Sequence, residues 1–177
     1  MDTEGSFIMY QTGQQVLYGI HGICNIVSIE PMRFGKVKAN YYCLQPIAQP
    51  DARYYVPVEN AAAVAKLRPL MSKEALLELL HSDAVRQDAW IPDENQRKQR
   101  YRELINSGDR AKLLSMIYCL HQHKKAQQSA GRKFHLCDEN FLHDAERLLN
   151  SEFSQVFGLE SGQVSGFIVR EMGIGEE

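Results

Sequence analysis

The first third of the chain alternates short apolar runs with turn residues, at a spacing typical of β-strands. β-Branched and aromatic residues dominate four runs, which are separated by turns that contain Gly or Pro. No segment between the runs is long enough for a crossover helix, and this favours an antiparallel meander. We therefore predict a small half-barrel of antiparallel strands, whose apolar runs are residues 16–18, 23–29, 41–44 and 54–58.

From Ser72 onward the apolar spacing changes from two residues to 3.6, which predicts helices. Ser72 is a suitable N-cap for the first helix and Asp109 for the third. The second helix covers roughly residues 93–106, and the last begins near Asp138 with the strongest amphipathic pattern of the chain. The expected fold class is α+β, with an N-terminal antiparallel β half-barrel followed by an all-helical C-terminal domain.

The expected domains are residues 1–68, 69–158 and 159–177. Pro69 marks the change from alternating to helical spacing, and Gly158 closes the last predicted helix. Residues 159–177 contain several glycines, are acidic and lack a core pattern. We therefore expect a flexible acidic tail after the helical domain.

Charge is distributed unevenly, although the 177 residues have a formal net charge of only −2. Residues 95–133 contain 10 Lys and Arg against 2 Asp and Glu. This basic block is the local footprint expected of a phosphate-binding surface. It follows Trp90, the only tryptophan of the chain.

The segment after the tryptophan predicts a helix with one apolar face. Pro92 suits a first helical turn, and Gly108 suits the left-handed residue that ends a helix. Tyr101, Leu104 and Ile105 have the spacing of an apolar stripe that packs on a core. The opposite face of the same helix is basic.

Two interpretations of the basic face remain open. Lys98 and Arg102 stand four residues apart, so on a helix they repel each other by a few tenths of a kcal/mol, on the order of 0.2–0.5. A polyanion would remove this cost. A solvated helix anchored by the tryptophan explains the same charges, because charge runs are common on solvent faces.

The cysteines and histidines do not indicate a metal site. The four cysteines include no C-x-x-C pair, which is typical of reduced thiols in an intracellular protein. A zinc site would need Cys119, His121 and His123 to converge, but on a helix His121 points nearly opposite to the other two. We therefore expect no metal ion.

Other function classes lack a signal. The N-terminus is acidic without an apolar segment of signal length, and no stretch approaches a membrane span, so we expect a cytoplasmic protein without membrane contact. His21 is a turn residue between two glycines, with no nucleophile or acid placed near it. We expect no enzymatic activity, no cofactor and no small-molecule substrate.

The order of several short motifs carries a resemblance to a known family. Residues 13–30 read GQQVLYGIHGICNIVSIE, residues 55–61 read YVPVENA, and residues 152–159 read EFSQVFGL. Trp90 and the basic helix that ends in Ser-Gly-Asp at 107–109 lie between them. In this order and spacing, the chain resembles the CarD family of bacterial transcription regulators (CarD/CdnL type) over residues 7–159.

The resemblance implies a Tudor-like first domain that binds the β subunit of RNA polymerase. It implies a helical second domain that contacts promoter DNA at the upstream edge of the bubble and modulates the stability of the open complex. The family's tryptophan acts there as a wedge in the minor groove, and Trp90 matches it by type and position. The DNA-binding candidates are Trp90, Arg97, Lys98, Arg100, Arg102, Arg132 and Lys133.

The polymerase-facing residues are harder to identify. The resemblance implies docking by strand addition, helped by basic side chains. Arg33, Lys36 and Arg53 are the candidates in the β domain, although solvated hairpin charges explain them equally well.

A second function class is also compatible with the sequence. In this alternative, the chain is a protein–protein interaction module without direct DNA binding, and the helical half is a docking surface. A salt-dependent affinity for forked DNA would separate the two classes.

Overall fold

The computed structural model describes residues 9–174, which form two compact units. The division falls between Leu70 and Met71, two residues after the predicted end of the first domain. Residues 67–69 form a strand that pairs with the first strand of the sheet, so the β unit continues past residue 68. Each unit has a hydrophobic core of its own.

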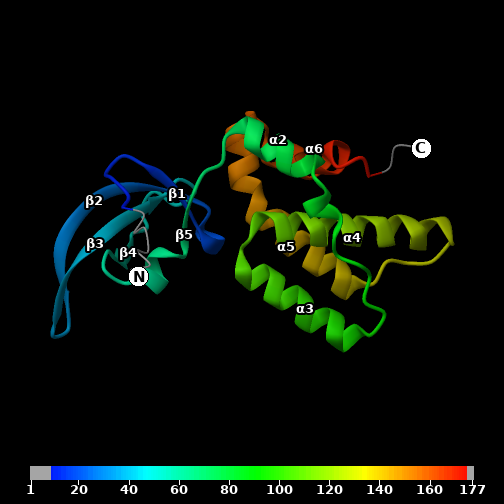
Figure 1. The fold of residues 1–177 in the computed structure, drawn as a ribbon, viewed down its shortest axis with the longest axis horizontal. Helices are drawn as coiled ribbons and strands as arrows, with labels where there is room; N and C mark the ends of the chain where they lie inside the picture. The colour runs from blue at the N-terminus through cyan, green and yellow to red at the C-terminus, as the bar shows by residue number, and fades with distance from the viewer. Residues whose placement is uncertain (1–8, 175–177) are drawn as a thin grey trace, which may run out of the picture. The chain divides into compact units, whose positions relative to one another are not determined.

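The first unit is a five-stranded antiparallel sheet with the strand order β4-β3-β2-β1-β5 (Figure 1). The predicted antiparallel strands are confirmed, and the Tudor-like description stays a prediction. Two further elements, α1 (Ala61–Val64) and β5 (Leu67–Pro69), have only four and three residues and are too short for the pattern to predict them. The elements are β1 (Gln15–Tyr18), η1 (Gly19–His21), β2 (Ile23–Phe34), β3 (Val37–Pro46), β4 (Tyr54–Pro57), α1 (Ala61–Val64) and β5 (Leu67–Pro69).

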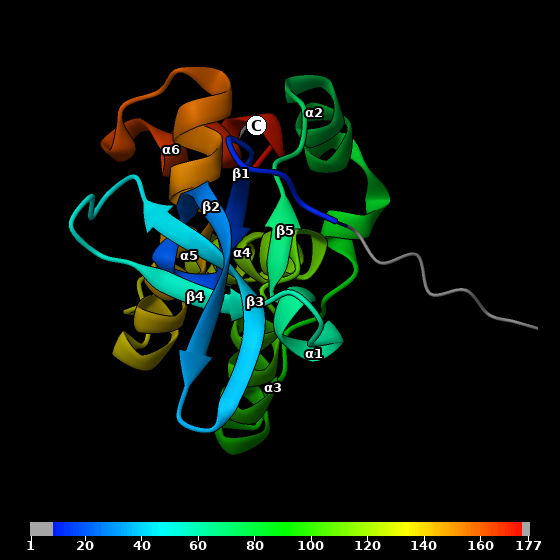
Figure 2. The same ribbon diagram turned by 90° about the vertical axis from the view of Figure 1, so that its left-hand side faces the viewer.

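Strands β2 and β3 form a long hairpin that extends beyond its neighbours in the sheet (Figure 2). Strand β1 pairs with β2 only as far as Asn25, and β4 pairs with β3 only from Tyr41 onward. Gly35, with φ of 63°, supplies the left-handed backbone that the tight turn requires. Among the described residues, 29–34 pair as strand residues only with β3, and 37–39 only with β2, so the outer edges of both stretches are open.

The inner face of the sheet packs into a core that also fixes the segment before β1. The hydroxyl of Tyr10 donates to the carbonyl of Leu67 at 3.0 Å, and the hydroxyl of Tyr42 accepts from the backbone N–H of Tyr10 at 3.2 Å. The buried residues of this core are Tyr10, Val16, Cys24, Ile26, Tyr42, Leu44, Val56 and Leu67.

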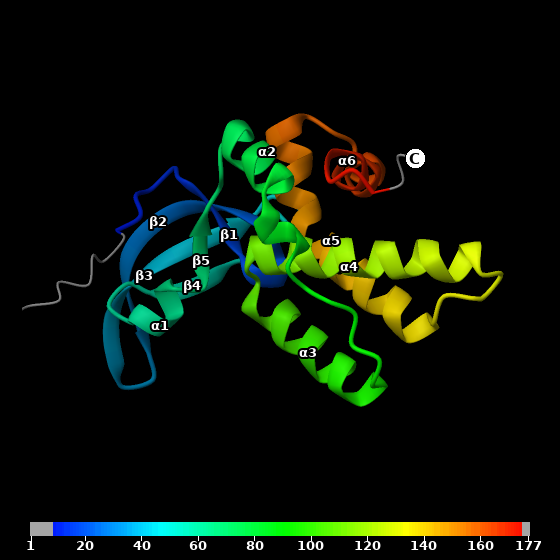
Figure 3. The ribbon, with the colours of Figure 1, turned by 45° about the vertical axis from the view of Figure 1, so that its right-hand side comes forward.

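The second unit is helical, as predicted. Figure 3 shows α3 and α4 side by side, joined by a tight turn. Helix α4 also contacts α5 and η2, and the last helix, α6, contacts α2 and α5. The elements are α2 (Lys73–His81), η2 (Asp83–Arg86), α3 (Glu94–Ser107), α4 (Arg110–Ser129), α5 (Leu136–Phe157), η3 (Ser161–Gln163) and α6 (Val164–Glu171).

The predicted helix ends are confirmed at the positions where the prediction rested on a capping residue. The predicted N-caps Ser72 and Asp109 each accept a hydrogen bond from a backbone N–H of the first turn, at 3.1 and 3.0 Å, and Asp93 caps α3 in the same way at 2.8 Å. Gly108 and Gly158 end α3 and α5 in the left-handed conformation. Helix α5 begins two residues before the predicted start, with no side-chain cap.

The prediction of a flexible tail after residue 158 is wrong for the described part of that segment. Residues 161–171 form η3 and α6, and side chains of residues 164–174 complete the core of the second unit. The apolar residues repeat at helical spacing, but the glycines and acidic residues between them obscure the pattern. The buried side chains are Val164, Ile168, Met172 and Ile174. Residues 175–177, also part of the predicted tail, lie outside the described residues.

Polar contacts fix α6 as well. The carboxylate of Glu146 on α5 accepts a hydrogen bond from Ser165 at 2.6 Å and lies 3.0 Å from Nε2 of His121. Burial alone would raise the pKa of Glu146, but the hydrogen bonds from His121 and Ser165 outweigh burial and lower it. Glu146 therefore joins α4, α5 and α6 as a carboxylate.

One residue of the basic block has a structural role in this unit. Glu152 is fully buried and accepts hydrogen bonds from Arg110 Nε and Nη2 at 2.6 and 2.8 Å. It also accepts the backbone N–H of Met71 at 2.9 Å. The positive charge of Arg110 therefore compensates a buried carboxylate.

Candidate nucleic-acid interface

Trp90 lies on the connector between η2 and α3, and its ring is sandwiched between two side chains. The imidazole of His123 stacks on the indole with 3.4 Å between ring centroids and an interplanar angle of 8°. The guanidinium carbon of Arg97 lies over the same ring, 4.3 Å from its centroid. Two groups this close to one centroid cannot share a face, so each covers one face of the indole.

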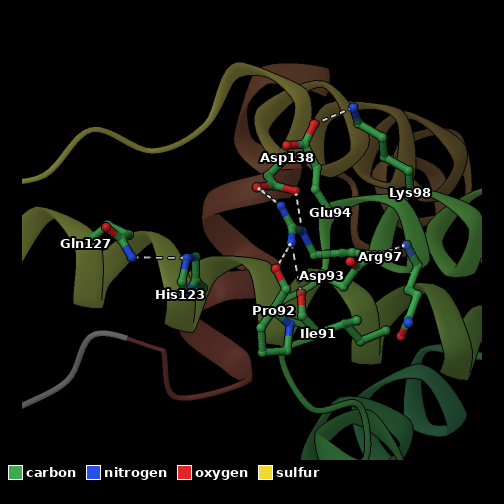
Figure 4. Close-up of polar contacts among 10 residues, drawn as sticks. Ile91, Pro92, Asp93, Glu94, Arg97, Lys98, His123, Gln127 and Asp138 are labelled. Atoms are coloured by element: carbon green, nitrogen blue, oxygen red, sulfur yellow. Dashed lines mark hydrogen bonds and ion pairs between the residues drawn. The ribbon is translucent and has the colours of Figure 1, made fainter.

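Arg97 is buried, with 5% of its surface exposed, and is held by four hydrogen bonds (Figure 4). Its Nε and Nη2 donate to the two carboxylate oxygens of Asp138 at 2.8 and 3.0 Å. Its Nη1 donates to the carbonyls of Ile91 and Pro92 at 2.8 and 3.3 Å. The guanidinium thus joins α3 to α5 and fixes the connector that carries the tryptophan.

This position differs from the solvent-facing DNA contact that the charge pattern predicts for Arg97. Burial alone would lower the pKa of Arg97, but the hydrogen bonds and charge of Asp138 raise it. A phosphate that bound this guanidinium would have to displace Asp138, which is itself 2% exposed. A buried carboxylate without its partner is strongly unfavourable, so we leave Arg97 out of the proposed DNA surface.

The other candidate cations of α3 lie on two different flanks of the helix. Lys98 and Arg102 are four residues apart and share a face, and Lys98 forms an ion pair with Glu94 (Figure 4). Arg100 lies about 160° around the helix axis from Lys98. Its Nη2 is 3.4 Å from the carboxylate of Asp88. Helix α3 therefore does not offer one continuous basic face.

Arg132 and Lys133 lie in the exposed segment between α4 and α5. Lys133 lines a pocket of about 310 Å³ together with Trp90 and Arg97. The structure therefore brings three of the seven DNA-binding candidates to one place and leaves Arg100 on another flank. The remaining lining residues are Pro92, Glu94, His123, Gln127, His135 and Asp138.

The three residues considered as zinc ligands have different surroundings. Cys119 is buried beside Tyr101, His121 contacts Glu146, and His123 stacks on Trp90. Within residues 9–174, no three His, Cys, Asp or Glu side chains lie close enough together to hold a metal ion.

The polymerase-binding candidates of the first unit are exposed but do not lie together. Arg33 and Lys36 are at the tip of the β2–β3 hairpin. Arg53 directly precedes β4, whose first residue pairs with Leu44 near the other end of β3. At about 3.3 Å per residue, roughly 20 Å of β3 separates Arg53 from the tip. A single small contact cannot involve all three side chains.

The sheet also carries an apolar surface that the charge pattern does not reveal. Phe34 pairs with Val37, and its ring centroid lies 5.0 Å from that of Tyr41 and 5.8 Å from that of Tyr55. The strand register places these four residues on the face opposite the core. Phe34, Val37 and Tyr55 are 48%, 63% and 38% exposed. We call these four residues the outer-face patch.

None of the helices within residues 9–174 combines the length and the apolar character needed to cross a membrane.

Comparison with known families finds a similarity for the first unit. No curated protein sequence matches the chain. Residues 10–71 match the family model of the CarD-like/TRCF RID domain, which covers about a third of the chain and includes all five strands. The first unit is therefore similar to CarD/TRCF-type RNA polymerase-interacting domains.

Proposed function

We propose that this protein is a non-enzymatic transcription regulator that binds the β subunit of RNA polymerase through its first unit. Its helical unit contacts promoter DNA at the upstream edge of the bubble and modulates the stability of the open complex. The observation that carries the polymerase part is the match of residues 10–71 to the CarD-like/TRCF RID family. The DNA part is supported by Trp90 and the exposed cations of the helical unit.

The open hairpin and the outer-face patch suit a protein partner. An exposed strand edge can accept a strand from a partner through main-chain hydrogen bonds, and pockets for alternate side chains then supply specificity. The patch provides aromatic side chains of the kind that are enriched at protein interfaces. We therefore assign the polymerase contact to the β2–β3 hairpin, with Arg33 and Lys36 at its tip.

The polymerase contact can be tested with a charge introduced into the patch. Val37→Asp in the full chain is expected to weaken binding to RNA polymerase by about tenfold or more, since a buried interface residue is replaced by an unpaired charge. Val37 is well exposed, so the fold should be retained. Binding would be measured by surface plasmon resonance on immobilised polymerase.

Ile20→Asp is the matched control for that variant. Ile20 is 74% exposed in η1, on the same sheet unit but outside the outer-face patch. The Ile20→Asp variant should bind RNA polymerase with the affinity of the wild type. Equal affinity of both variants and the wild type would remove the patch from the interface, and wild-type protein that bound no polymerase would contradict the proposed function itself.

The alternative function, a protein-interaction module without DNA contact, gains support from the paired cations. Arg97 and Arg110 are bonded to buried carboxylates, and Lys98 and Arg100 have acidic partners. The positive charges of these four residues are therefore already compensated by carboxylates. Exposed Arg102, Arg132 and Lys133 remain as the candidates for phosphate contact.

Salt dependence distinguishes the two functions. The double variant Arg102→Ala/Lys133→Ala is expected to flatten the slope of log K against log salt for DNA by up to about 1.8, or about 0.9 for each phosphate that is no longer neutralised. Arg147→Ala/Arg170→Ala removes the same charge from exposed positions on α5 and α6 and should leave the slope unchanged. Equal slopes for the two variants would favour the module without DNA contact.

A further inference from the structure

The two side chains that cover the indole of Trp90 are held with very different strength. Arg97 is buried and bonded to Asp138 and to two backbone carbonyls. His123 is only partly buried, and its ring is hydrogen-bonded to Gln127, one turn further along α4, at 3.2 Å (Figure 4). The Arg97 face is thus covered by a group with four hydrogen bonds, whereas the His123 face is covered by a ring that is hydrogen-bonded to a side chain of its own helix.

The geometry on the His123 face is that of a stacked pair of aromatic rings. The near-parallel arrangement at 3.4 Å places the imidazole where a flat heterocycle would stack on the indole. The pocket of about 310 Å³ beside the ring is lined by His123, Gln127 and Lys133. This pocket offers room for the imidazole to turn aside and leaves a cation at the edge of the uncovered face.

We propose that His123 competes, within the molecule, with an unpaired nucleobase for the open face of Trp90. The proposal rests on the proposed function of the helical unit in DNA binding. In the closed arrangement, the imidazole occupies the stacking position. DNA with unpaired bases engages Trp90 only after His123 has turned away, so His123 limits the affinity for such DNA.

The electrostatic surroundings make this competition dependent on pH. Burial lowers the pKa of His123, Asp138 on α5 opposes this effect, and Arg97 on α3 adds to it. The other charged or titratable groups of the pocket are Glu94, Lys133 and His135. The pKa of His123 is lower in the closed arrangement than in the open one. The closed arrangement therefore has its full stability above the ordinary histidine pKa of about 6.5. This stability is lost as the pH falls through the lowered value.

The single tryptophan of the chain allows a test without DNA. In His123→Ala, one face of Trp90 is open, so acrylamide should quench its fluorescence more strongly than in the wild type. Wild-type quenching should increase as the pH falls below about 6.5, and His123→Ala should not show this rise. Gln127→Ala, which retains the imidazole but removes its hydrogen bond, should shift quenching in the same direction by less. His143→Ala, an exposed histidine of α5, is the control and should behave as the wild type.

Binding to forked DNA gives the second readout. Removal of an aromatic stacking interaction corresponds to a change of about two- to tenfold in an equilibrium constant. His123→Ala should therefore bind a fork with unpaired bases about two- to tenfold more tightly than the wild type, with no gain for fully paired DNA. The affinity of His143→Ala for forked DNA and for fully paired DNA should be unchanged.

The outcomes separate this proposal from the proposed function. Unchanged acrylamide quenching in His123→Ala would overturn the competition, whatever the DNA result. Stronger quenching with unchanged fork affinity, in a wild type that binds forked DNA, would also overturn it and leave the DNA function intact. Absence of DNA binding in all variants, including the wild type, would overturn both.

Discussion

Replacing Arg97 by alanine is expected to destabilise the helical unit by about 3–5 kcal/mol, because the substitution leaves the carboxylate of Asp138 buried without its partner. Asp138 is 2% exposed and accepts two hydrogen bonds from the guanidinium, and the substitution removes both of them. For a unit of this size, 1 kcal/mol shifts the melting temperature by about 4–8 °C. A decrease of more than about 10 °C is therefore expected, measured by circular dichroism at 222 nm.

Lys98→Ala is the matched control for this prediction. Lys98 lies on the same helix and has an ion pair with Glu94, but the pair is at the surface. Surface pairs of this kind contribute little to stability, so the melting temperature should change by only a few degrees. Arg97→Ala with the stability of Lys98→Ala would show that the guanidinium is exposed in solution, and would return Arg97 to the DNA-binding candidates.

A second variant separates the charge from the volume of the buried pair. Arg97→Met/Asp138→Leu removes both charges and retains most of the apolar volume, so it should recover much of the stability that Arg97→Ala removes. Circular dichroism would again report the melting temperature. If the double variant is as unstable as the single one, the hydrogen bonds to the carbonyls of Ile91 and Pro92 contribute more than the ion pair.

The sequence predicts the elements of this protein well where local rules determine them. Asp93 and Asp109 cap their helices, and Gly108 ends α3, because these residues satisfy free backbone groups within a single turn. The pattern does not predict β5, because three residues that include Pro69 form a strand only when β1 is beside them. Element boundaries therefore follow from local chemistry only where a cap or a turn is present.

The burial of Arg97 shows why the candidate site was predicted only in part. Counting charges treats every cation of a basic run as exposed. The positions of Arg97, Tyr101 and Leu104 place the arginine on the apolar stripe of α3, and Asp138 precedes Leu142 at the same helical spacing on α5. Opposite charges on the buried faces of two helices indicate a buried ion pair. Only the packing of α3 on α5 shows that Arg97 and Asp138 contact each other.

The position of Trp90 combines the two roles that the sequence leaves open, a wedge and a core anchor. The connector places the ring at the edge of the helical core, where it is partly buried, so neither description alone is sufficient. The cation–π contact with Arg97 and the stack on His123 stabilise the fold. The same ring borders the pocket that contains Lys133.

Trp90→Ala is accordingly expected to affect stability and function by different amounts. The decrease in stability should be about 2 kcal/mol, smaller than the 3–5 kcal/mol for removing an aromatic side chain from a full core. The lifetime of the open promoter complex should shorten by about tenfold, since one base stack contributes about 1–3 kcal/mol. Affinity for RNA polymerase should not change, because the polymerase contact is assigned to the other unit. Thermal melts, promoter-complex lifetimes and polymerase binding would be measured on the same preparation.

Two control variants decide whether the lifetime effect comes from the ring or from the fold. Trp90→Phe retains an aromatic face between Arg97 and His123 and should recover most of the stability and part of the lifetime. Leu79→Ala removes a partly buried side chain of α2 from the same core and should cost a similar stability without changing the ring. If Leu79→Ala shortens the promoter complex as much as Trp90→Ala does, the tryptophan acts through the stability of the helical unit. A lifetime that changes only with the indole requires that the ring itself contacts DNA.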